Sequence, residues 1–243
     1  MTKLITLQLT MFLLMLTGLF LRKKEIITAE GKRVLTDLVI NLILPANIVK
    51  SFLIEFNHSI FLNFLSILFI SIGIQLLCTF LSHTLYKKEP TSRRRVLQYG
   101  IVCSNAGFLG NPIAEGVFGS IGLSLASIYL IPMRIVMWSA GVSFFTEAPN
   151  KKTLVKKVVT HPCIVAAFIG ILLMLSQLKL PGFLVSSITS LSNCNTAMSM
   201  IVVGTILSDV DFHHLIDKTM LSYGVLRLII MPLIVFTSCS FFS

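Results

Sequence analysis

Eight apolar runs, each long enough to cross a lipid bilayer, constrain the fold of this 243-residue chain more than any other feature. A transmembrane helix needs about 20 predominantly apolar residues, and short loops separate these runs. The pattern predicts an all-α membrane protein of about 8 transmembrane helices, without room for a separate soluble domain. The runs cover residues 4–21, 38–54, 60–82, 96–118, 123–146, 162–178, 184–208 and 220–240.

The composition and the placement of charge support a membrane protein. Hydrophobic residues make up 55% of the chain and charged residues 12%, whereas about a quarter of the residues in a soluble domain are charged. The net charge is +10, and most of the 20 Lys and Arg residues lie in the loops after the first, third and fifth runs. Because basic loops stay in the cytoplasm, we expect the N-terminus to lie outside, with the protein in the plasma membrane. Since the basic residues are explained by membrane orientation, we expect no nucleic acid partner.

The cysteines do not indicate a disulfide framework or a metal site. All five lie within apolar runs without a CxxC pair; they are Cys78, Cys103, Cys163, Cys194 and Cys239. The first apolar run is followed by basic residues where a signal peptide would have a small-residue cleavage site. We therefore expect it to remain as the first transmembrane helix.

The apolar run at residues 96–118 is interrupted by residues that weaken or break a helix. These are Asn105, Gly107, Gly110, Asn111 and Pro112. In hydrocarbon a freed backbone group costs several kcal/mol, so a break persists only where protein or a water-filled cavity satisfies it. Secondary transporters place substrates and ions at such broken helices. We therefore predict that the chain is unwound around Pro112 and binds a solute there.

A comparison of the chain with itself indicates an inverted repeat. When the sequence is shifted along itself so that Gly18 aligns with Gly170, Asn41 aligns with Asn193. A unit of five helices begins outside and ends inside, so its copy crosses the membrane in the opposite direction. We expect one five-helix repeat at residues 1–146, with residues 96–118 as its broken helix. Residues 147–243 then form an incomplete second repeat of three helices, without counterparts of the fourth and fifth.

Several motifs resemble the auxin efflux carrier family, which includes plant PIN-type carriers and bacterial malate permeases. The most specific are SNAGFLGNPIAEGVFGSIGL in the fourth run and NLILPANIV in the second. The resemblance implies a fold of ten helices in two inverted repeats, whose broken fourth and ninth helices cross near the substrate. It implies that Pro112 is the crossover proline, with Asn105 shortly before it and Asn41 and Pro45 facing it from the second helix.

Other polar residues within apolar runs are further candidates, each with a structural alternative. Asn111 suits a carboxylate ligand, but amides also hold helices together. Glu115 is a candidate for proton coupling, because a membrane carboxyl must be paired or protonated; its alternative location is near the outer surface. Arg134 could attract an anionic substrate, or pair with Glu115. Lys50 is expected to extend to the membrane interface.

The second half of the chain offers weaker candidates. Asn193 and Asn195 in the seventh run could line the cavity or merely hydrogen-bond between helices. Arg227 is assigned no role. The adjacent pair His213 and His214 lies in a loop with three Asp residues, an arrangement that seldom binds metal.

Together these features predict a secondary transporter that moves small organic anions, such as dicarboxylates, by alternating access. No catalytic motif, ATP site, cofactor site or metal site is recognised, so an enzyme is not expected. The lipid bilayer and the organic anion are the expected partners, and the family resemblance is compatible with a homodimer. The alternative is a truncated, non-transporting membrane protein or interaction subunit, because the second repeat lacks counterparts of the fourth and fifth helices.

Overall fold

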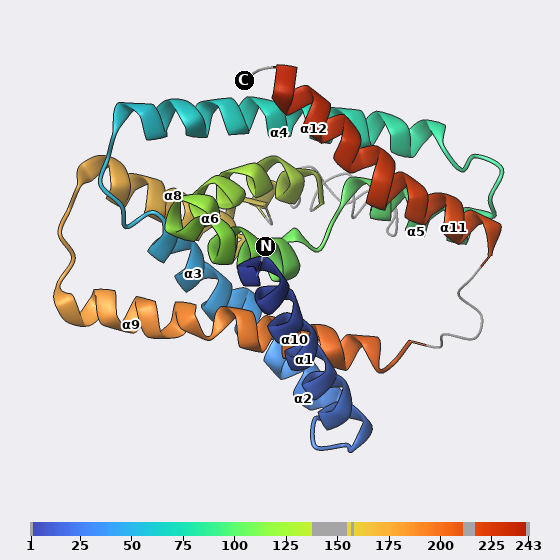
Figure 1. The fold of residues 1–243 in the computed structure, drawn as a ribbon, viewed down its shortest axis with the longest axis horizontal. Helices are drawn as coiled ribbons and strands as arrows, with labels where there is room; N and C mark the ends of the chain where they lie inside the picture. The colour runs from blue at the N-terminus through green and yellow to red at the C-terminus, as the bar shows by residue number, and fades with distance from the viewer. Residues whose placement is uncertain (1, 138–154, 157, 211–216, 242–243) are drawn as a thin grey trace. The chain divides into compact units, whose positions relative to one another are not determined.

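The computed structural model describes residues 2–137, 155–156, 158–210 and 217–241, and every regular element within these residues is helical (Figure 1). The prediction of an all-α protein is confirmed. The elements are α1 (Thr2–Lys23), α2 (Ala29–Leu38), η1 (Val39–Ile43), α3 (Leu44–Ser51), α4 (His58–Thr84), α5 (Thr91–Val102), η2 (Ala106–Gly110), α6 (Asn111–Val136), α8 (Pro162–Ser176), α9 (Gly182–Asn193), α10 (Asn195–Leu207), α11 (Lys218–Val225), η5 (Leu226–Ile230) and α12 (Met231–Phe241).

Six helical stretches within the described residues are long and apolar enough to cross a membrane. They are Leu4–Lys23, Ala29–Ser51, His58–Thr84, Thr91–Val136, Gly182–Leu207 and Lys218–Thr237. Large apolar side chains on them are exposed, among them Phe69 (70%) and Leu228 (79%), as expected of surfaces that face lipid. The protein is therefore a multi-pass membrane protein. The 46-residue stretch Thr91–Val136 takes in two of the expected spans and α8 is shorter, so the count of eight stays a prediction.

The chain folds as two compact units, each assembled from segments far apart in the sequence. The first comprises Met1–Phe64, Asn105–Leu130 and Val159–Val210. The second comprises Leu65–Ser104, Ile131–Val158 and Asp211–Ser243. Both units draw on the two halves of the sequence, so the division into repeats at residues 146 and 147 stays a prediction.

In the first unit, α1 crosses α10 at very short range (Figure 1). A Cβ atom at Gly18 would lie 2.2 Å from the carbonyl oxygen of Ile201, and one at Gly204 would lie 2.0 Å from that of Met15. Small residues allow membrane helices to approach backbone to backbone, where dispersion contacts replace the missing hydrophobic drive. These two glycines therefore set the distance between α1 and α10.

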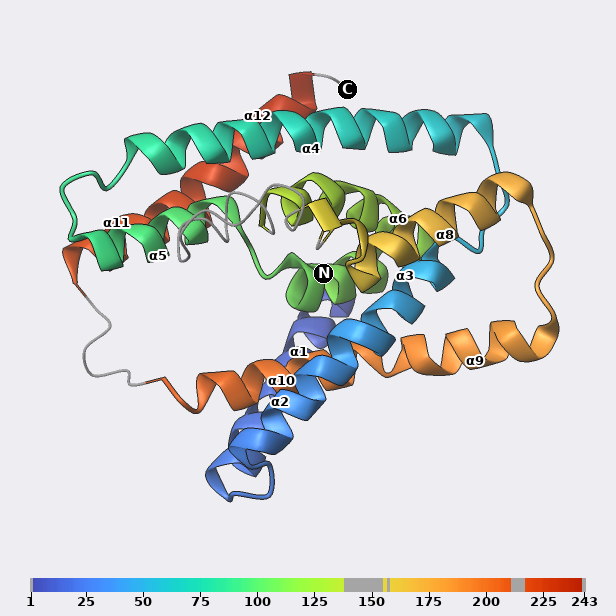
Figure 2. The same cartoon turned by 180° about the vertical axis from the view of Figure 1, so that it is seen from behind.

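Helix α3 forms the centre of the first unit. It packs against both α8 and α9 (Figure 2), and four of its eight residues are buried. Phe52, which follows α3, is fully buried and stacks edge-on against Phe64, with ring centroids 5.7 Å apart. A Cβ at Gly170 of α8 would lie 2.5 Å from the Phe52 ring, so the glycine makes room for the aromatic side chain. Polar residues on α3 are thereby held between two helices.

Each of three π-helical turns, η1, η2 and η5, ends two residues before a proline: Pro45, Pro112 or Pro232. A proline ring inside an α-helix clashes with the carbonyl four residues earlier and removes a hydrogen bond. In each turn the residue before the proline donates its N–H to the carbonyl five residues earlier, for example Asn111 to Ala106. The wider turn takes up the proline without unwinding the helix.

Gly119 marks the predicted boundary between the fourth and fifth spans. Its φ of 66° and ψ of −155° kink α6, and only glycine adopts this region readily. A Cβ at Gly122 would lie 2.5 Å from the Ala114 carbonyl oxygen, so the chain on either side of the kink approaches closely. The fourth and fifth apolar runs therefore meet at a sharp kink between two helical segments.

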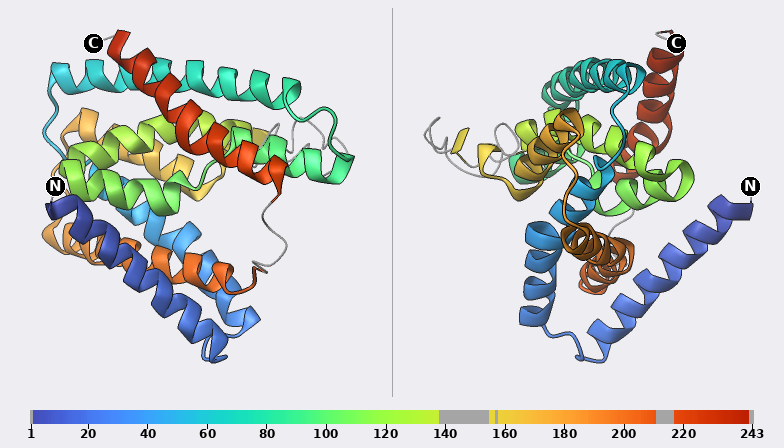
Figure 3. Two further views of the ribbon diagram at one scale, coloured as in Figure 1. Left: turned by 45° about the vertical axis from the view of Figure 1, so that its right-hand side comes forward. Right: turned by 90° about the vertical axis from the view of Figure 1, so that its left-hand side faces the viewer.

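Ion pairs join α1 and α2 to the residue Asp209, which lies just after the end of α10. Figure 3 shows α1 and α2 as two arms joined by a short connection, and α10 ends nearby at Leu207. Asp209 accepts hydrogen bonds from Lys32 and from Arg22, the latter at 3.3 Å. The Lys32 hydrogen bond, followed by the charges of Lys32 and Arg22, lowers the pKa of Asp209 below its ordinary value.

This ion pair predicts a pH-dependent contribution to stability. A carboxyl with a depressed pKa stabilises the folded state above its unfolded pKa and loses that contribution as the pH falls through the folded value. We expect Asp209→Asn to lower the Tm of the detergent-solubilised protein slightly at pH 7, and the difference to disappear as the pH falls through the depressed pKa of Asp209. Asp37→Asn, at an exposed carboxyl of α2, is the control. A Tm difference that persists at low pH would contradict the assignment.

Candidate functional site

The predicted break in the fourth helix exists, but it begins before the expected position. Helix α5 ends at Val102, and the backbone is extended at Cys103, with φ of −111° and ψ of 141°. Asn105 is also outside the helical region, with φ of −80° and ψ of 46°, before η2 starts at Ala106. Pro112 is buried in the first turn of α6. The prediction that the chain unwinds around Pro112 is therefore wrong in its position, because the π-helical turn absorbs the proline.

Side chains of the second unit satisfy the carbonyls that the break exposes at the end of α5. Arg227 of η5 donates to the carbonyl oxygens of Ile101, at 3.2 Å, and Cys103, at 2.9 Å. Gln75 of α4, only 7% exposed, donates to the carbonyl between them, that of Val102, at 3.2 Å. Three successive carbonyls are thus paired, and the guanidinium charge faces the negative end of the helix dipole.

In the first unit, a chain of hydrogen bonds runs from α10 through α3 to Glu115 of α6. Ser199 donates to Asn195 (3.2 Å), Asn195 donates to the Oδ1 of Asn47 (3.4 Å), and Asn47 donates to Glu115 Oε2 (3.1 Å). Asn47 also donates to Ser192 Oγ of α9, at 2.9 Å. Asn47, Asn195 and Ser199 are at most 1% exposed. This polar cluster holds the Glu115 carboxylate in place.

Glu115 also contacts a cation, Lys50 of α3. The Lys50 Nζ lies 3.5 Å from Glu115 Oε1 and 3.4 Å from Asn193 Oδ1. The side chains of Lys50 and Glu115 are 25% and 27% exposed. The structure therefore gives Glu115 a partner that the sequence did not suggest, since Lys50 was expected at the membrane interface. The sequence left open whether Asn193 and Asn195 line a cavity or hydrogen-bond between helices. Both hydrogen-bond to residues of the polar cluster.

Asn111 is a buried polar residue of the first unit whose side chain is unpaired within the described part of the chain. Its side chain is fully buried at the junction of η2 and α6. Neither its Oδ1 nor its Nδ2 has a hydrogen-bond partner among the described residues. Leaving a buried polar group unpaired costs about 1–3 kcal/mol. Such an amide is suited to a polar ligand, because a ligand group can provide both a donor and an acceptor for it.

The remaining predicted residues have different surroundings. Asn105 is exposed at the helix break. Asn41 is exposed and donates to the Asp37 carbonyl of its own helix, at 2.8 Å, so the structure does not bring it into the polar cluster. Pro45 lies in the first turn of α3. Arg134 is 5% exposed and belongs to the second unit. Their roles in substrate binding stay predictions.

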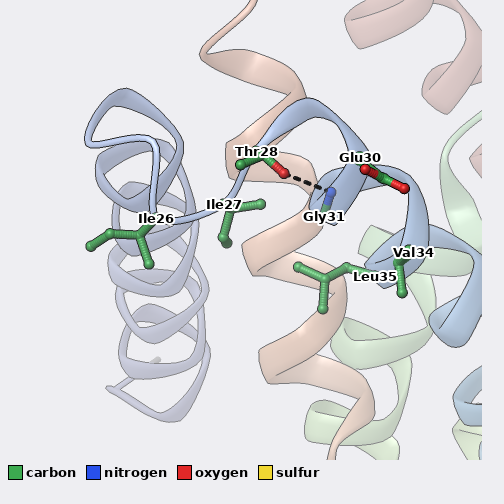
Figure 4. Close-up of a pocket in the computed structure, with 7 residues that line it drawn as sticks. All are labelled: Ile26, Ile27, Thr28, Glu30, Gly31, Val34 and Leu35. Atoms are coloured by element: carbon green, nitrogen blue, oxygen red, sulfur yellow. Dashed lines mark hydrogen bonds between the residues drawn. The ribbon is translucent and has the colours of Figure 1, made fainter.

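A surface pocket lies at the start of α2, where Thr28 caps the helix by accepting a hydrogen bond from the Gly31 N–H (Figure 4). Ile26, Ile27 and Leu35 contribute much of its apolar lining, and it shares no residue with the polar cluster. No group of three potential metal ligands occurs in the part of the chain that the structure describes. His213 and His214 lie outside those residues.

Sequence reasoning gave no site role to six residues: Gln75, Asn47, Lys50, Ser192, Ser199 and Arg227. Each is a polar residue within or at the end of an apolar run, and that placement was the available signal. An intramembrane polar group is costly and therefore usually paired. The pairing partners, however, come from distant parts of the chain, for example 145 residues apart for Asn47 and Ser192.

Comparison with known proteins gives consistent matches. A family model described as membrane transport protein matches residues 4–243. An uncharacterised transporter of Methanocaldococcus jannaschii is 25% identical over 215 residues, which are 82% of this chain and 68% of that protein. An uncharacterised transporter of Methanothermobacter thermautotrophicus is 27% identical over 234 residues, or 93% of this chain and 74% of its own length.

Proposed function

Because this chain belongs to the membrane transport protein family, which is the family of the auxin efflux carriers, we propose that it is a secondary transporter of small organic anions such as dicarboxylates. Transport proceeds by alternating access. The observation that carries the proposal is the fully buried, unpartnered amide of Asn111, next to an interrupted membrane helix. A transporter must offer its solute polar groups that the protein itself does not satisfy.

The chemistry of the site suits an anion better than a cation or an apolar solute. The amide nitrogen of Asn111 can donate hydrogen bonds to carboxylate oxygens. Asn105, exposed at the break, offers a second amide. A dicarboxylate presents four acceptor oxygens, and its transfer into the membrane is costly unless donors replace its water. Pro112, Asn41 and Pro45 complete the proposed substrate site in the first unit, and Arg134 of the second unit keeps its proposed role of attracting the anion.

Glu115 is the proposed proton-coupling group. It accepts hydrogen bonds from Asn47 and Lys50, and protonation would remove the charge that holds both donors. A carboxyl that exchanges its ion pair for a proton during the transport cycle couples proton movement to solute movement.

We further propose that the protein lies in the plasma membrane as a homodimer. Its N-terminus lies outside, because the loops after the first, third and fifth apolar runs are basic.

Uptake of labelled dicarboxylates into proteoliposomes tests the proposal. We expect Asn111→Leu to reduce the flux at least tenfold, because the isosteric side chain cannot hydrogen-bond to the solute. It is expected to leave the Tm unchanged or higher, since it removes an unsatisfied buried amide. Glu115→Gln is expected to abolish stimulation by a pH gradient. Asn63→Leu, at an exposed asparagine of α4, is the control.

Three outcomes would contradict these assignments. Flux of the wild-type protein no higher than that of empty vesicles would overturn transport of dicarboxylates. Flux of Asn111→Leu equal to that of an active wild type would remove Asn111 from the substrate site. A large loss of stability in Asn111→Leu would instead assign the amide a structural role.

A further inference from the structure

We propose that the Lys50 ammonium is the docking point for a substrate carboxylate, and that Glu115 occupies this point as an internal competitor when no substrate is bound. The inference rests on the proposed transport of organic anions and identifies the residue that selects for negative charge. The sequence placed Lys50 at the membrane interface. The structure places its ammonium on the edge of the polar cluster, beside Glu115 and Asn193.

The contacts of Lys50 are loose enough to be exchanged. Charge-assisted hydrogen bonds between an ammonium and a carboxylate are usually about 2.7–2.9 Å long. The distances from Lys50 Nζ to Glu115 Oε1 and to Asn193 Oδ1 are 3.5 and 3.4 Å. An ammonium has three protons to donate, and a quarter of this side chain is accessible. A second carboxylate can therefore approach the ammonium and displace Glu115.

Glu115 is held more firmly on its other side. Its Oε2 accepts from Asn47, whose amide is anchored by Ser192 of α9 and Asn195 of α10. Asn47 is fully buried, and its two N–H groups and its carbonyl oxygen are all used. Glu115 therefore keeps a partner when Lys50 leaves it. The carboxylate remains within the polar cluster while the ammonium turns to the substrate.

Competition between two carboxylates for one ammonium explains the arrangement better than a structural ion pair does. A purely structural pair would be expected to have short, shielded contacts, since an exposed pair contributes little to stability. A lysine without a counter-charge would also be costly in the membrane between transport events. Glu115 removes that cost in the empty carrier, and a substrate carboxylate removes it in the loaded carrier.

Titration of the detergent-purified full chain with succinate, citrate and acetate tests this assignment by calorimetry. We expect Lys50→Met to weaken binding of the preferred anion at least tenfold, and Lys50→Arg to weaken it less. Glu115→Gln is expected to tighten binding at least threefold, because the competitor loses its charge. Lys179→Met, at an exposed lysine of the same unit outside the polar cluster, is the matched control.

The outcomes separate this inference from the proposed function. If the wild type binds none of the three anions, both fail. If the wild type binds an anion and Lys50→Met binds it equally well, only the role of Lys50 fails. If Lys50→Met does not fold, Glu115→Gln decides: unchanged or weaker binding overturns the competition, and tighter binding supports it. A structural ion pair predicts a lower Tm for Glu115→Gln without tighter binding.

Discussion

Replacement of Arg227 by leucine is expected to destabilise the protein by about 3 kcal/mol or more, the largest effect that we predict for a single side chain. Arg227 pairs with the carbonyl oxygens of Ile101 and Cys103, where α5 ends. Hydrogen bonds to a charged group contribute about 1.5–3 kcal/mol each. In a bilayer water cannot replace them freely, so both carbonyls would be left unpaired.

The measurement is the yield of folded protein and its Tm in detergent after expression of Arg227→Leu. Arg227→Lys is expected to restore part of the stability, because an ammonium reaches one carbonyl but lacks the planar fork that reaches two. Arg95→Leu, at an exposed arginine of α5, controls for the loss of a positive charge. Equal Tm values for Arg227→Leu and wild type would show that the end of α5 does not depend on the guanidinium.

Replacement of Gly204 by leucine is expected to be nearly as damaging, by separating α1 from α10. A Cβ at this position would lie 2.0 Å from the Met15 carbonyl oxygen and 2.8 Å from the Leu19 nitrogen. Both atoms belong to the backbone of α1, so no side-chain rotation relieves the clash. The helices must move apart and lose their close packing, which costs about 1–3 kcal/mol.

Thermal unfolding of Gly204→Leu against Gly73→Leu isolates this effect. Gly73 lies within α4, and a Cβ atom there would have no neighbouring atom within 4 Å, so a leucine side chain faces open space. Gly73→Leu is expected to keep the wild-type Tm or raise it, since leucine favours a helix more than glycine does. If both variants unfold at the same temperature, the tight contact of α1 with α10 does not hold the first unit together.

Part of the site follows from local chemistry that the sequence displays. The cluster of Asn, Gly and Pro residues between Asn105 and Pro112 indicated an interrupted helix, and α5 does end at Val102. The displacement of the break from Pro112 was not predictable from proline chemistry alone. A proline can interrupt a helix or widen one turn of it, and neighbouring helices decide which costs less.

The partners of the buried polar residues were beyond sequence reasoning for a different reason. Asn47 meets Ser192 and Asn195, and Lys50 meets Glu115. Such pairs depend on how each helix is rotated about its axis and how far it is shifted along its neighbour. In lipid, hydrophobicity does not select a rotation as it does in water, because lipid tails are as apolar as the helix surfaces.

The sequence by itself determined that the protein is helical and embedded in a membrane, that its fourth helix is interrupted, and which family it resembles. These properties depend on hydropathy and on backbone chemistry within a few residues. Only the tertiary structure decided that Arg227 and Gln75 cap the interrupted helix, that Lys50 faces Glu115, and that Asn111 is left without a partner among the described residues. Those properties depend on contacts between segments far apart in the chain, where a shift of one turn changes every partner.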